Sequence, residues 1–226
     1  MIQKTLFLLL AAASAPAFAQ VSWHAGVSGG QARTDSELVA NRESTITDAT
    51  GLRTDFDAQD SAWKGFFGLR LNPVVALELA YADLGRHRTH TTMLGGQLQR
   101  PAAISIDRRI SGYGIDLVAT PPLGWRSVSV FGRIGAFRSR LEATATLEGN
   151  IVFTGGDADE RARTTTRQET VLKTGLGGEW WFRPDAALRL EWERYHEVGK
   201  PFAVGGSGTT GEADTDVVSL GVLMRF

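Results

Sequence analysis

Apolar and polar residues alternate with a period of two in eight separate segments of the chain. Successive side chains of a β-strand point to opposite faces, so this period is typical of strands. The eight segments are residues 21–32, 62–71, 74–84, 106–120, 127–142, 165–182, 186–196 and 216–226. The pattern therefore predicts an all-β protein in which each strand has one apolar face and one polar face.

The connections between these segments alternate between short and long. The three short ones carry the Pro, Asn, Asp and Gly that turns favour, at residues 72–73, 121–124 and 183–185. The other four are long and polar, at residues 33–61, 85–105, 143–164 and 197–215. Because each tight turn joins an even-numbered strand to the next odd-numbered one, all tight turns lie at one end. This layout predicts an eight-stranded antiparallel up-and-down transmembrane β-barrel with long extracellular loops.

Residues 1–19 have the composition of a secretory signal peptide. Lys4 precedes an apolar run over residues 6–13, and small residues follow up to Ala17-Phe18-Ala19. A membrane anchor is the alternative, but the run is well short of the roughly 20 apolar residues that a spanning helix needs. We therefore predict cleavage before Gln20, export through the periplasm, and a barrel domain over residues 20–226.

Charge and cysteine content exclude several classes of protein. The chain has 24 Lys and Arg against 25 Asp and Glu, and one of these cations, Lys4, lies in the signal peptide, so residues 20–226 carry a net charge of −2. This balance gives no reason to expect a nucleic-acid partner. The sequence contains no cysteine, which excludes a disulfide framework and thiolate ligation of a metal.

The polar faces of the strands distinguish between two kinds of barrel. In a soluble lipocalin-type barrel the apolar faces line a cavity, whereas in an outer-membrane barrel they meet lipid. The apolar stripes are about as long as the 9–11 residues of a strand that crosses a bilayer. The opposite faces carry charges, together with small residues that a narrow lumen requires: Gly68, Ala80, Gly112, Gly114, Gly175 and Gly177. Both observations favour the membrane barrel, and the soluble barrel is the alternative.

Aromatic residues gather at the ends of the apolar stripes. Near the tight turns they are Trp23, Trp125, Trp180, Phe182 and Phe226. Toward the long loops they are Trp63, Tyr81, Tyr113, Trp192 and Tyr195. Membrane barrels place aromatic side chains at both membrane–water interfaces, so we expect two aromatic girdles.

Four strand segments resemble the transmembrane domain of outer membrane protein A. They are ELAYADLGR (78–86), GLGGEW (175–180), LRLEW (188–192) and VSLGVLMRF (218–226). Each is modest alone, but their order on the third, sixth, seventh and eighth strands makes the set specific. The resemblance implies an up-and-down barrel in the outer membrane of a Gram-negative cell. Full-length members add a peptidoglycan-binding domain, and because this sequence stops at Phe226 we expect no tethering to the cell wall.

Charged residues on the polar faces form a predicted network inside the barrel. The resemblance implies acidic and basic side chains in the lumen, and a charge that faced lipid would be costly. The candidates are Glu78, Asp116, Arg133, Lys173, Glu179, Arg189 and Glu191. Because a buried charge needs a partner, we predict that Glu78 pairs with Arg133 or Lys173, and Arg189 with Glu179 or Glu191. A structural plug is one interpretation of this network, and a gate in a small pore is the other.

The sequence offers no strong candidate for a catalytic, cofactor or metal site. His24 and His196 are expected at opposite ends of the barrel, and His87 and His90 in a long loop. Acyl transfer would need a serine beside such a histidine, and no His-x-Ser pair lies on a lipid-facing strand. The two loop histidines lack a third metal ligand, and the acidic residues 157–160 lack the spacing of a calcium loop. We therefore predict neither enzyme activity nor a bound metal.

These features predict a structural outer-membrane barrel, with a small or gated pore for ions and small solutes as its transport role. Adhesion or host interaction through the long loops is the alternative, and a lipid-modifying enzyme is a third hypothesis. The expected partners are outer-membrane lipids, lipopolysaccharide and the barrel assembly machinery, and we expect a monomer. Three arginines in or near the third loop form a basic patch suited to lipopolysaccharide phosphates: Arg161, Arg163 and Arg167.

The last strand ends on an aromatic residue. We expect this strand to pair with the first one so that no sheet edge is left open. Its lipid-facing residues include Leu220, Val222, Met224 and Phe226. The resemblance implies that a terminal aromatic residue on such a strand is the signal that the assembly machinery reads.

Overall fold

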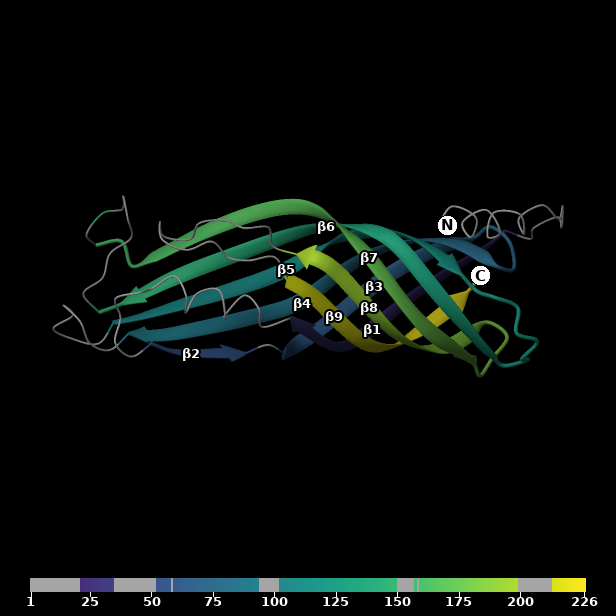
Figure 1. Ribbon diagram of the computed structural model, residues 1–226. Coiled ribbons are helices and arrows are strands. Elements are labelled where there is room, and N and C mark those ends of the chain that lie inside the picture. Colours follow the sequence, from purple (N-terminus) through teal and green to yellow (C-terminus); the bar gives the residue numbers. More distant parts are fainter. Residues whose placement is uncertain are drawn as a thin grey trace, which may run out of the picture.

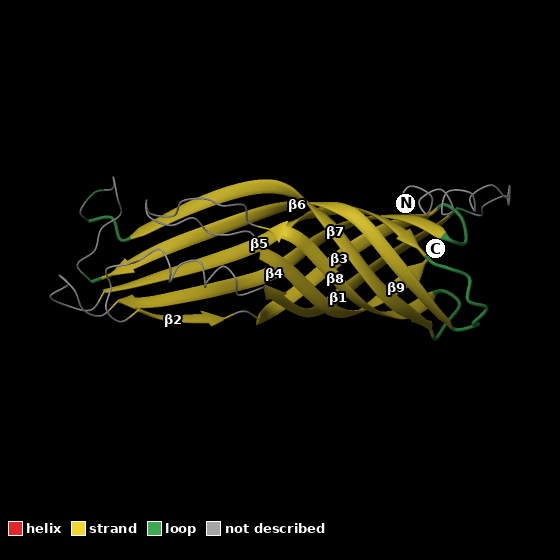
Figure 2. Cartoon of the chain, in the orientation of Figure 1, coloured by secondary structure: helices red, strands yellow, loops and turns green. Residues whose placement is uncertain are grey.

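The computed structural model describes residues 21–34, 52–57, 59–93, 102–149, 157, 159–198 and 213–226. Within these ranges every regular element is a β-strand (Figure 2). None of the described residues belongs to a helix long and apolar enough to cross a membrane. The predicted signal peptide lies outside these ranges, so its cleavage stays a prediction.

The described residues form nine strands, eight of which close into a barrel (Figure 1). The strands are β1 (Ser22–Thr34), β2 (Leu52–Asp57), β3 (Gln59–Arg70), β4 (Val75–Met93), β5 (Ala102–Ala119), β6 (Val128–Glu148), β7 (Ala162–Trp181), β8 (Ala186–Val198) and β9 (Ala213–Arg225). Around the ring the order is β1-β3-β4-β5-β6-β7-β8-β9, all antiparallel, and β9 pairs back to β1. The predicted eight-stranded antiparallel barrel is confirmed, and the short β2 lies beside the far half of β4.

Strands β4 to β7 are longer than the sequence pattern predicts. They contain 19, 18, 21 and 20 residues, against 13 each for β1, β8 and β9. The predicted loops 85–105 and 143–164 are therefore wrong over much of their length, and part of the predicted loop 33–61 forms β2 and the start of β3. Because roughly 9–11 residues suffice to cross a bilayer, β4 to β7 project well beyond the shorter strands, at the end away from the tight turns (Figure 1).

A β-bulge explains why the alternation in β4 is lost after Leu84. The register with β5 shifts between Asp83 and Arg86, and Gly85 adopts a φ of 85° that favours glycine. Asp83 stabilises the bulge, because its Oδ1 accepts the Gly85 N–H at 3.0 Å and its Oδ2 accepts from Arg109 at 2.6 Å. The extra residue reverses which parity faces inward: Ala82 and Leu84 are buried before the bulge, and His87 is buried after it.

The distribution of burial is the reverse of that in a soluble protein. Large apolar side chains point outward along every strand of the barrel; Leu79 and Leu220, for example, are 55% and 58% exposed. Charged side chains point inward and are almost fully covered, with Glu78 at 0% and Arg189 at 2% exposure. A continuous exposed apolar band is incompatible with a water-soluble surface. The barrel is therefore one that faces lipid, and the soluble lipocalin-type alternative is wrong.

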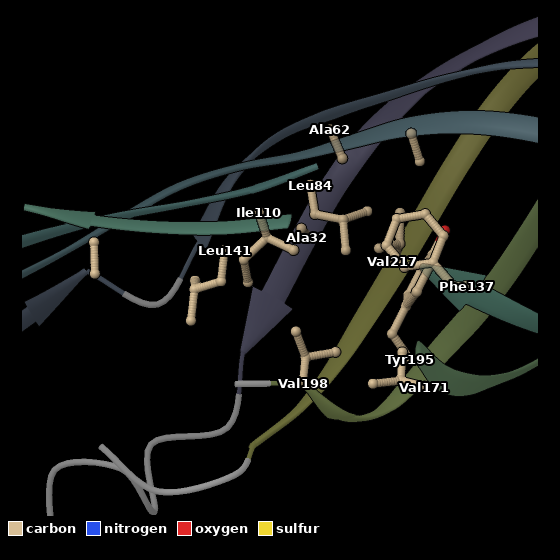
Figure 3. Packing of buried hydrophobic residues seen from close by; sticks show 12 residues of the cluster. Ala32, Ala62, Leu84, Ile110, Phe137, Leu141, Val171, Tyr195, Val198 and Val217 are labelled. Atoms are coloured by element: carbon tan, nitrogen blue, oxygen red, sulfur yellow. The ribbon is translucent and has the colours of Figure 1, made fainter. Parts of the chain in front are cut away.

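Two apolar layers fill the lumen above and below its charged middle. Toward the tight turns lie Phe66, Ala76, Ala80, Val118, Phe131, Ala187 and Leu223, with Trp181 packed against them; we call these the inner apolar layer. Toward the long loops lie Ala32, Ala62, Ala82, Leu84, Ile110, Phe137, Leu141, Ala143, Val171, Tyr195, Val198 and Val217, the outer apolar layer (Figure 3). The side chains of the outer layer come from every barrel strand and meet inside the barrel.

Candidate functional site

The charged middle of the lumen is the main polar site among the described residues. All seven side chains predicted for the network are buried there: Glu78, Asp116, Arg133, Lys173, Glu179, Arg189 and Glu191. They come from five strands, β4 to β8. The structure therefore brings the whole predicted set together.

Glu78 and Arg189 bridge the barrel from one wall to the opposite one. Their strands, β4 and β8, are four steps apart in either direction around the ring. Arg189 donates from Nη2 to Glu78 Oε1 at 2.9 Å and from Nη1 to Oε2 at 3.1 Å. The bridge extends further, because Arg189 also donates to Glu179 at 2.7 Å and His24 Nε2 lies 2.9 Å from Glu78 Oε1. A bidentate guanidinium–carboxylate pair of this kind is both strong and fixed in its geometry.

Arg133 is the hub of the network, with four carboxylates around one guanidinium. Its Nη2 lies 3.1 Å from Glu78 and 2.9 Å from Glu191, and its Nη1 lies 3.3 Å from Asp116 and 3.0 Å from Glu193. Glu78 and Asp116 face each other directly in the β4–β5 register. Two like charges in that position would repel, and the Arg133 guanidinium contacts both of them with the opposite charge.

Apart from His24, two members of the network are absent from the predicted set: Lys64 and Glu193. Lys64 Nζ lies 2.5 Å from Glu191 and 2.9 Å from Glu193, and Glu193 also lies 3.3 Å from Lys173. Lys173 in turn lies 2.5 Å from Asp116. Period-two alternation places both residues on the polar face, which is the signal that could have found them.

The network holds five carboxylates, four fixed cations and one histidine. The carboxylates are Glu78, Asp116, Glu179, Glu191 and Glu193, and the cations are Lys64, Arg133, Lys173 and Arg189. Every one of these nine groups has an opposite charge within 3.3 Å. This complete pairing is what the cost of burying a charge demands.

Glycines on the inward faces make room for the network. A Cβ added to Gly68 would lie 2.2 Å from the imidazole of His24, and one added to Gly135 would lie 2.1 Å from Asp116 Oδ1. Real Cβ atoms do not approach other atoms so closely, and Gly135 is also confined by the Ile115 carbonyl at 2.2 Å. The narrow lumen therefore accepts these charged side chains only because the facing positions carry no side chain.

Aromatic rings separate the charges from the two ends of the barrel. Arg189 lies 4.5 Å from the Phe66 ring centre and 4.8 Å from that of Phe131, both in the inner apolar layer. At the other end Lys173 lies 5.6 Å from the Tyr195 ring. A cavity of about 10 Å³ lies between Lys64, Glu193 and the outer apolar layer, which is room for about one water molecule.

The predicted girdle residues lie outward, although to different degrees. Trp23, Trp63, Tyr113, Trp125 and Trp180 are exposed, whereas Tyr81 and Trp192 are half-buried. Trp63 packs against Tyr81 with the rings tilted by 47° and 5.4 Å between ring centres, and Tyr81 meets Tyr113 edge-on at 5.0 Å between ring centres. Tyr195 does not belong with them: it is 1% exposed and packs inside the barrel against Phe137 at 4.8 Å. It shares the parity of Glu193, which is why it points inward.

The histidines lie differently from what the sequence predicts. His87 and His90 lie on β4 rather than in a loop; His87 is buried inside the barrel, whereas His90 bonds Ser105 Oγ at 2.9 Å. No group of three or more metal-ligating His, Cys, Asp or Glu side chains exists within the described ranges. The acidic segment 157–160 is only partly described. There Arg163 donates to both oxygens of Glu160, at 2.9 and 2.6 Å, and lowers the pKa of that carboxyl.

One arrangement outside the barrel resembles a catalytic triad in outline. Thr174 Oγ1 lies 2.9 Å from His196 Nε2, and His196 Nδ1 lies 3.9 Å from Asp214 Oδ2. The second distance is too long for a hydrogen bond. Asp214 is otherwise engaged, because its Oδ1 accepts the backbone N–H of Glu197 at 3.0 Å. Sequence reasoning missed this cluster because its members lie on three different strands.

The predicted assembly signal forms the outer face of β9 and its end. Leu220, Val222, Met224 and Phe226 are all exposed, and Phe226 is the most exposed at 69%. The backbone of Phe226 is nonetheless fixed, since its N–H donates to the Trp23 carbonyl at 2.8 Å. The terminal residue thus closes the ladder between the last and first strands.

An eight-stranded barrel with an apolar exterior and a charged interior defines an outer-membrane β-barrel protein. The sequence matches the family of the outer membrane protein beta-barrel domain over residues 5–226, and the chain belongs to this family. The expected likeness to outer-membrane barrels is confirmed, and the chain is a protein of the Gram-negative outer membrane. No curated protein matches the sequence.

Several solved structures are similar to this barrel. Neisserial surface protein A has 13% sequence identity and a TM-score of 0.51, over 91% of this chain and 99% of that one. The attachment invasion locus protein of Yersinia pestis has 14% identity and a TM-score of 0.43, over 90% and 98%. The outer membrane protease OmpT of Escherichia coli has 12% identity and a TM-score of 0.47, over 91% and 97%. Identities this low show a shared fold and no more.

Proposed function

We propose that this protein is a structural outer-membrane barrel whose lumen is closed, and that the charged network is a plug. The observation that carries this proposal is the bridge between Glu78 and Arg189 across the full width of the barrel. The bridge lies between the inner and outer apolar layers. An ion that crossed the lumen would therefore lose its hydration in each layer, and it would have to separate the paired charges of the network that lies between them. The network also fixes the strand register, because each of its pairs joins specific positions on different strands.

A solute-uptake assay tests the closed lumen. Liposomes that contain the refolded protein should swell in small sugars no faster than protein-free liposomes. Faster swelling would support the gated-pore interpretation, in which the network rearranges to open a path. A 16- or 18-stranded porin is the positive control, because its lumen is wide and water-filled.

Surface interaction is the second candidate function, and the length of β4 to β7 favours it. These strands form a wall that extends well beyond the ends of the shorter strands, as Figure 1 shows. Deleting residues 149–161 and joining β6 directly to β7 by a short turn would remove the tip of this wall and leave both strands whole. Unchanged binding of the bacteria to cultured cells would support the purely structural role. A loss of binding would support adhesion.

Enzyme activity is not part of this proposal, and the Thr174–His196–Asp214 cluster is the place to test it. A threonine hydroxyl is a hindered nucleophile, and the histidine lacks a bonded carboxylate to orient it. Mass spectra of lipid A and phospholipids should be identical with wild-type protein and with Thr174→Ala. Lipid products that disappear with this variant would make the protein a lipid-modifying enzyme.

The partners of the barrel are proposed on the same basis. The exposed apolar band requires outer-membrane lipids around it. Lipopolysaccharide phosphates fit the arginines near the far ends of β6 and β7, of which Arg161 donates to the Gly149 carbonyl at 3.1 Å. Every barrel strand has both neighbours within one chain, which supports a monomer. We also propose that the barrel assembly machinery recognises the exposed apolar side chains of β9 and Phe226.

A further inference from the structure

The end of the barrel that carries the tight turns holds a cavity of about 420 Å³. All three tight turns contribute to it, through Pro73, through residues 120–126 and through Pro184. Its floor consists of the last inward-facing side chains of the strands, including Ser129 and Trp181. Tight turns face the periplasm in barrels of this kind, so the cavity is the periplasmic mouth of the lumen.

Four arginines and no acidic residue line this mouth: Arg70, Arg126, Arg183 and Arg225. Within the described residues only one of the four forms a side-chain ion pair, Arg183 with Asp185 at 3.1 Å. Arg70 donates to the Pro73 carbonyl at 3.3 Å, and its Nε is buried without a hydrogen-bond partner. Glu179, the nearest acid of the network, is already held by Arg189 at 2.7 Å. Among the described residues, the mouth therefore carries more positive charge than its ion pairs neutralise.

The arginines are positioned among rigid apolar groups. The Arg225 guanidinium lies 4.0 Å from the centre of the Trp181 ring, and the Trp181 Nε1–H donates to Ser129 Oγ at 3.3 Å. Pro121, Pro122 and Trp125 form another part of the wall. Stacking on an aromatic face leaves the edge of a guanidinium free to donate, which suits recognition of a planar or tetrahedral anion.

We propose that the periplasmic mouth binds a phosphoryl group through Arg70, Arg126 and Arg225. Three positive charges that form no ion pair with the described residues match the dianion of a phosphate monoester better than the single charge of a carboxylate, and the guanidinium fork fits phosphate oxygens in pairs. The volume is that of a site for a small ligand. The group comes either from a soluble phosphate ester or from the headgroup of an inner-leaflet phospholipid, which lies at the same level as the mouth.

Binding to the full chain in nonionic maltoside micelles tests this proposal, because the detergent contains no phosphate. One arm titrates glycerol 3-phosphate and follows tryptophan fluorescence, to which Trp125 and Trp181 contribute, with equilibrium dialysis as the second readout. The other arm adds phosphatidylglycerol to the micelles and compares it with diacylglycerol of the same acyl chains. Saturable binding that weakens with salt is expected in at least one arm, and the arm that responds identifies the source of the phosphoryl group.

Substitutions locate the site. Arg225→Gln and Arg126→Gln should each weaken binding about tenfold, as expected for the loss of a hydrogen bond between charged groups. Arg126 lies in a turn, so its variant tests the site even where Arg225→Gln fails to fold. Arg140→Gln, which removes an exposed arginine from the other half of the barrel, should leave the affinity unchanged. Three results would overturn the proposal. They are no saturable binding in either arm, a loss of affinity in Arg140→Gln equal to that in the mouth variants, and binding of hexaglutamate, a polyanion without phosphate, when neither phosphate ligand binds.

Discussion

Glu78 and Arg189 lie 2.9 Å apart although their strands stand on opposite sides of an eight-stranded ring. A single ion pair therefore spans the lumen. Most residues around it are either charged and paired or apolar and packed, and the cavity of about 10 Å³ near Lys64 and Glu193 has room for about one water molecule. This geometry makes the interior of the barrel a polar core rather than a channel. The predictions below test that description.

Arg133 should be the most sensitive position of the network. Arg133→Ala removes the cation shared by four carboxylates, and loss of one partner of a buried pair costs about 3–5 kcal/mol. Equilibrium unfolding in denaturant, followed by tryptophan fluorescence in lipid vesicles, measures this loss. Arg140→Ala is the control, since within the described ranges Arg140 forms one ion pair, an exposed one at 3.9 Å, and such pairs contribute about 0–1 kcal/mol. Equal losses for the two variants would mean that the network does not stabilise the barrel.

Gly135 should tolerate no side chain, whereas Gly132 on the same strand should accept one. A Cβ at Gly135 would meet Asp116 Oδ1 at 2.1 Å, but at Gly132 the nearest atom is the Gly175 carbonyl oxygen at 4.0 Å. Overpacking costs about 1–3 kcal/mol, so Gly135→Ala should unfold at lower denaturant concentration than the wild type. Gly132→Ala should stay within about 0.5 kcal/mol of the wild type. A Gly135→Ala barrel as stable as Gly132→Ala would show that the lumen has spare room.

Phe226 should matter more for delivery than for the folded barrel. Its ring is 69% exposed, so Phe226→Ala removes little packing, and the backbone bond to Trp23 is retained. We expect a clear fall in the amount of protein in the outer membrane with little change in unfolding of the refolded protein. Phe182→Ala, at an exposed aromatic residue of the same end, is the matched control. Normal membrane levels of Phe226→Ala would refute a role in assembly.

The ring of strands could be predicted from the sequence because period-two alternation is a local property. The long strands show where such reasoning fails. The bulge at Gly85 and a second register shift between Tyr195 and Val198 reverse the inward parity, so the alternation disappears although the strand continues. The first three residues of β7, Ala162 to Thr164, lack the apolar stripe of the rest of the strand, so the sequence predicts them as part of a loop.

The sequence predicts most of the charged residues that lie in the lumen, but it does not determine which of them pair with one another. Alternation assigns Glu78, Arg133 and Arg189 to one face, and the cost of burial demands that they pair. Alternation does not give the position of each side chain along the barrel axis, because neighbouring strands are staggered. That is why Lys64 and Glu193 were missing from the predicted network, although both lie on the polar face. The periplasmic mouth could not be predicted at all, because its arginines come from distant turns and strand ends.

Single-channel recording in planar bilayers tests the closed lumen most directly. The wild-type protein and Glu78→Ala should both give no discrete conductance steps, because the inner and outer apolar layers stay closed when one member of the charged network is removed. Reproducible steps in the wild type, with a conductance or ion selectivity that changes in Glu78→Ala, would contradict the account. They would show that the bridge between Glu78 and Arg189 is a gate.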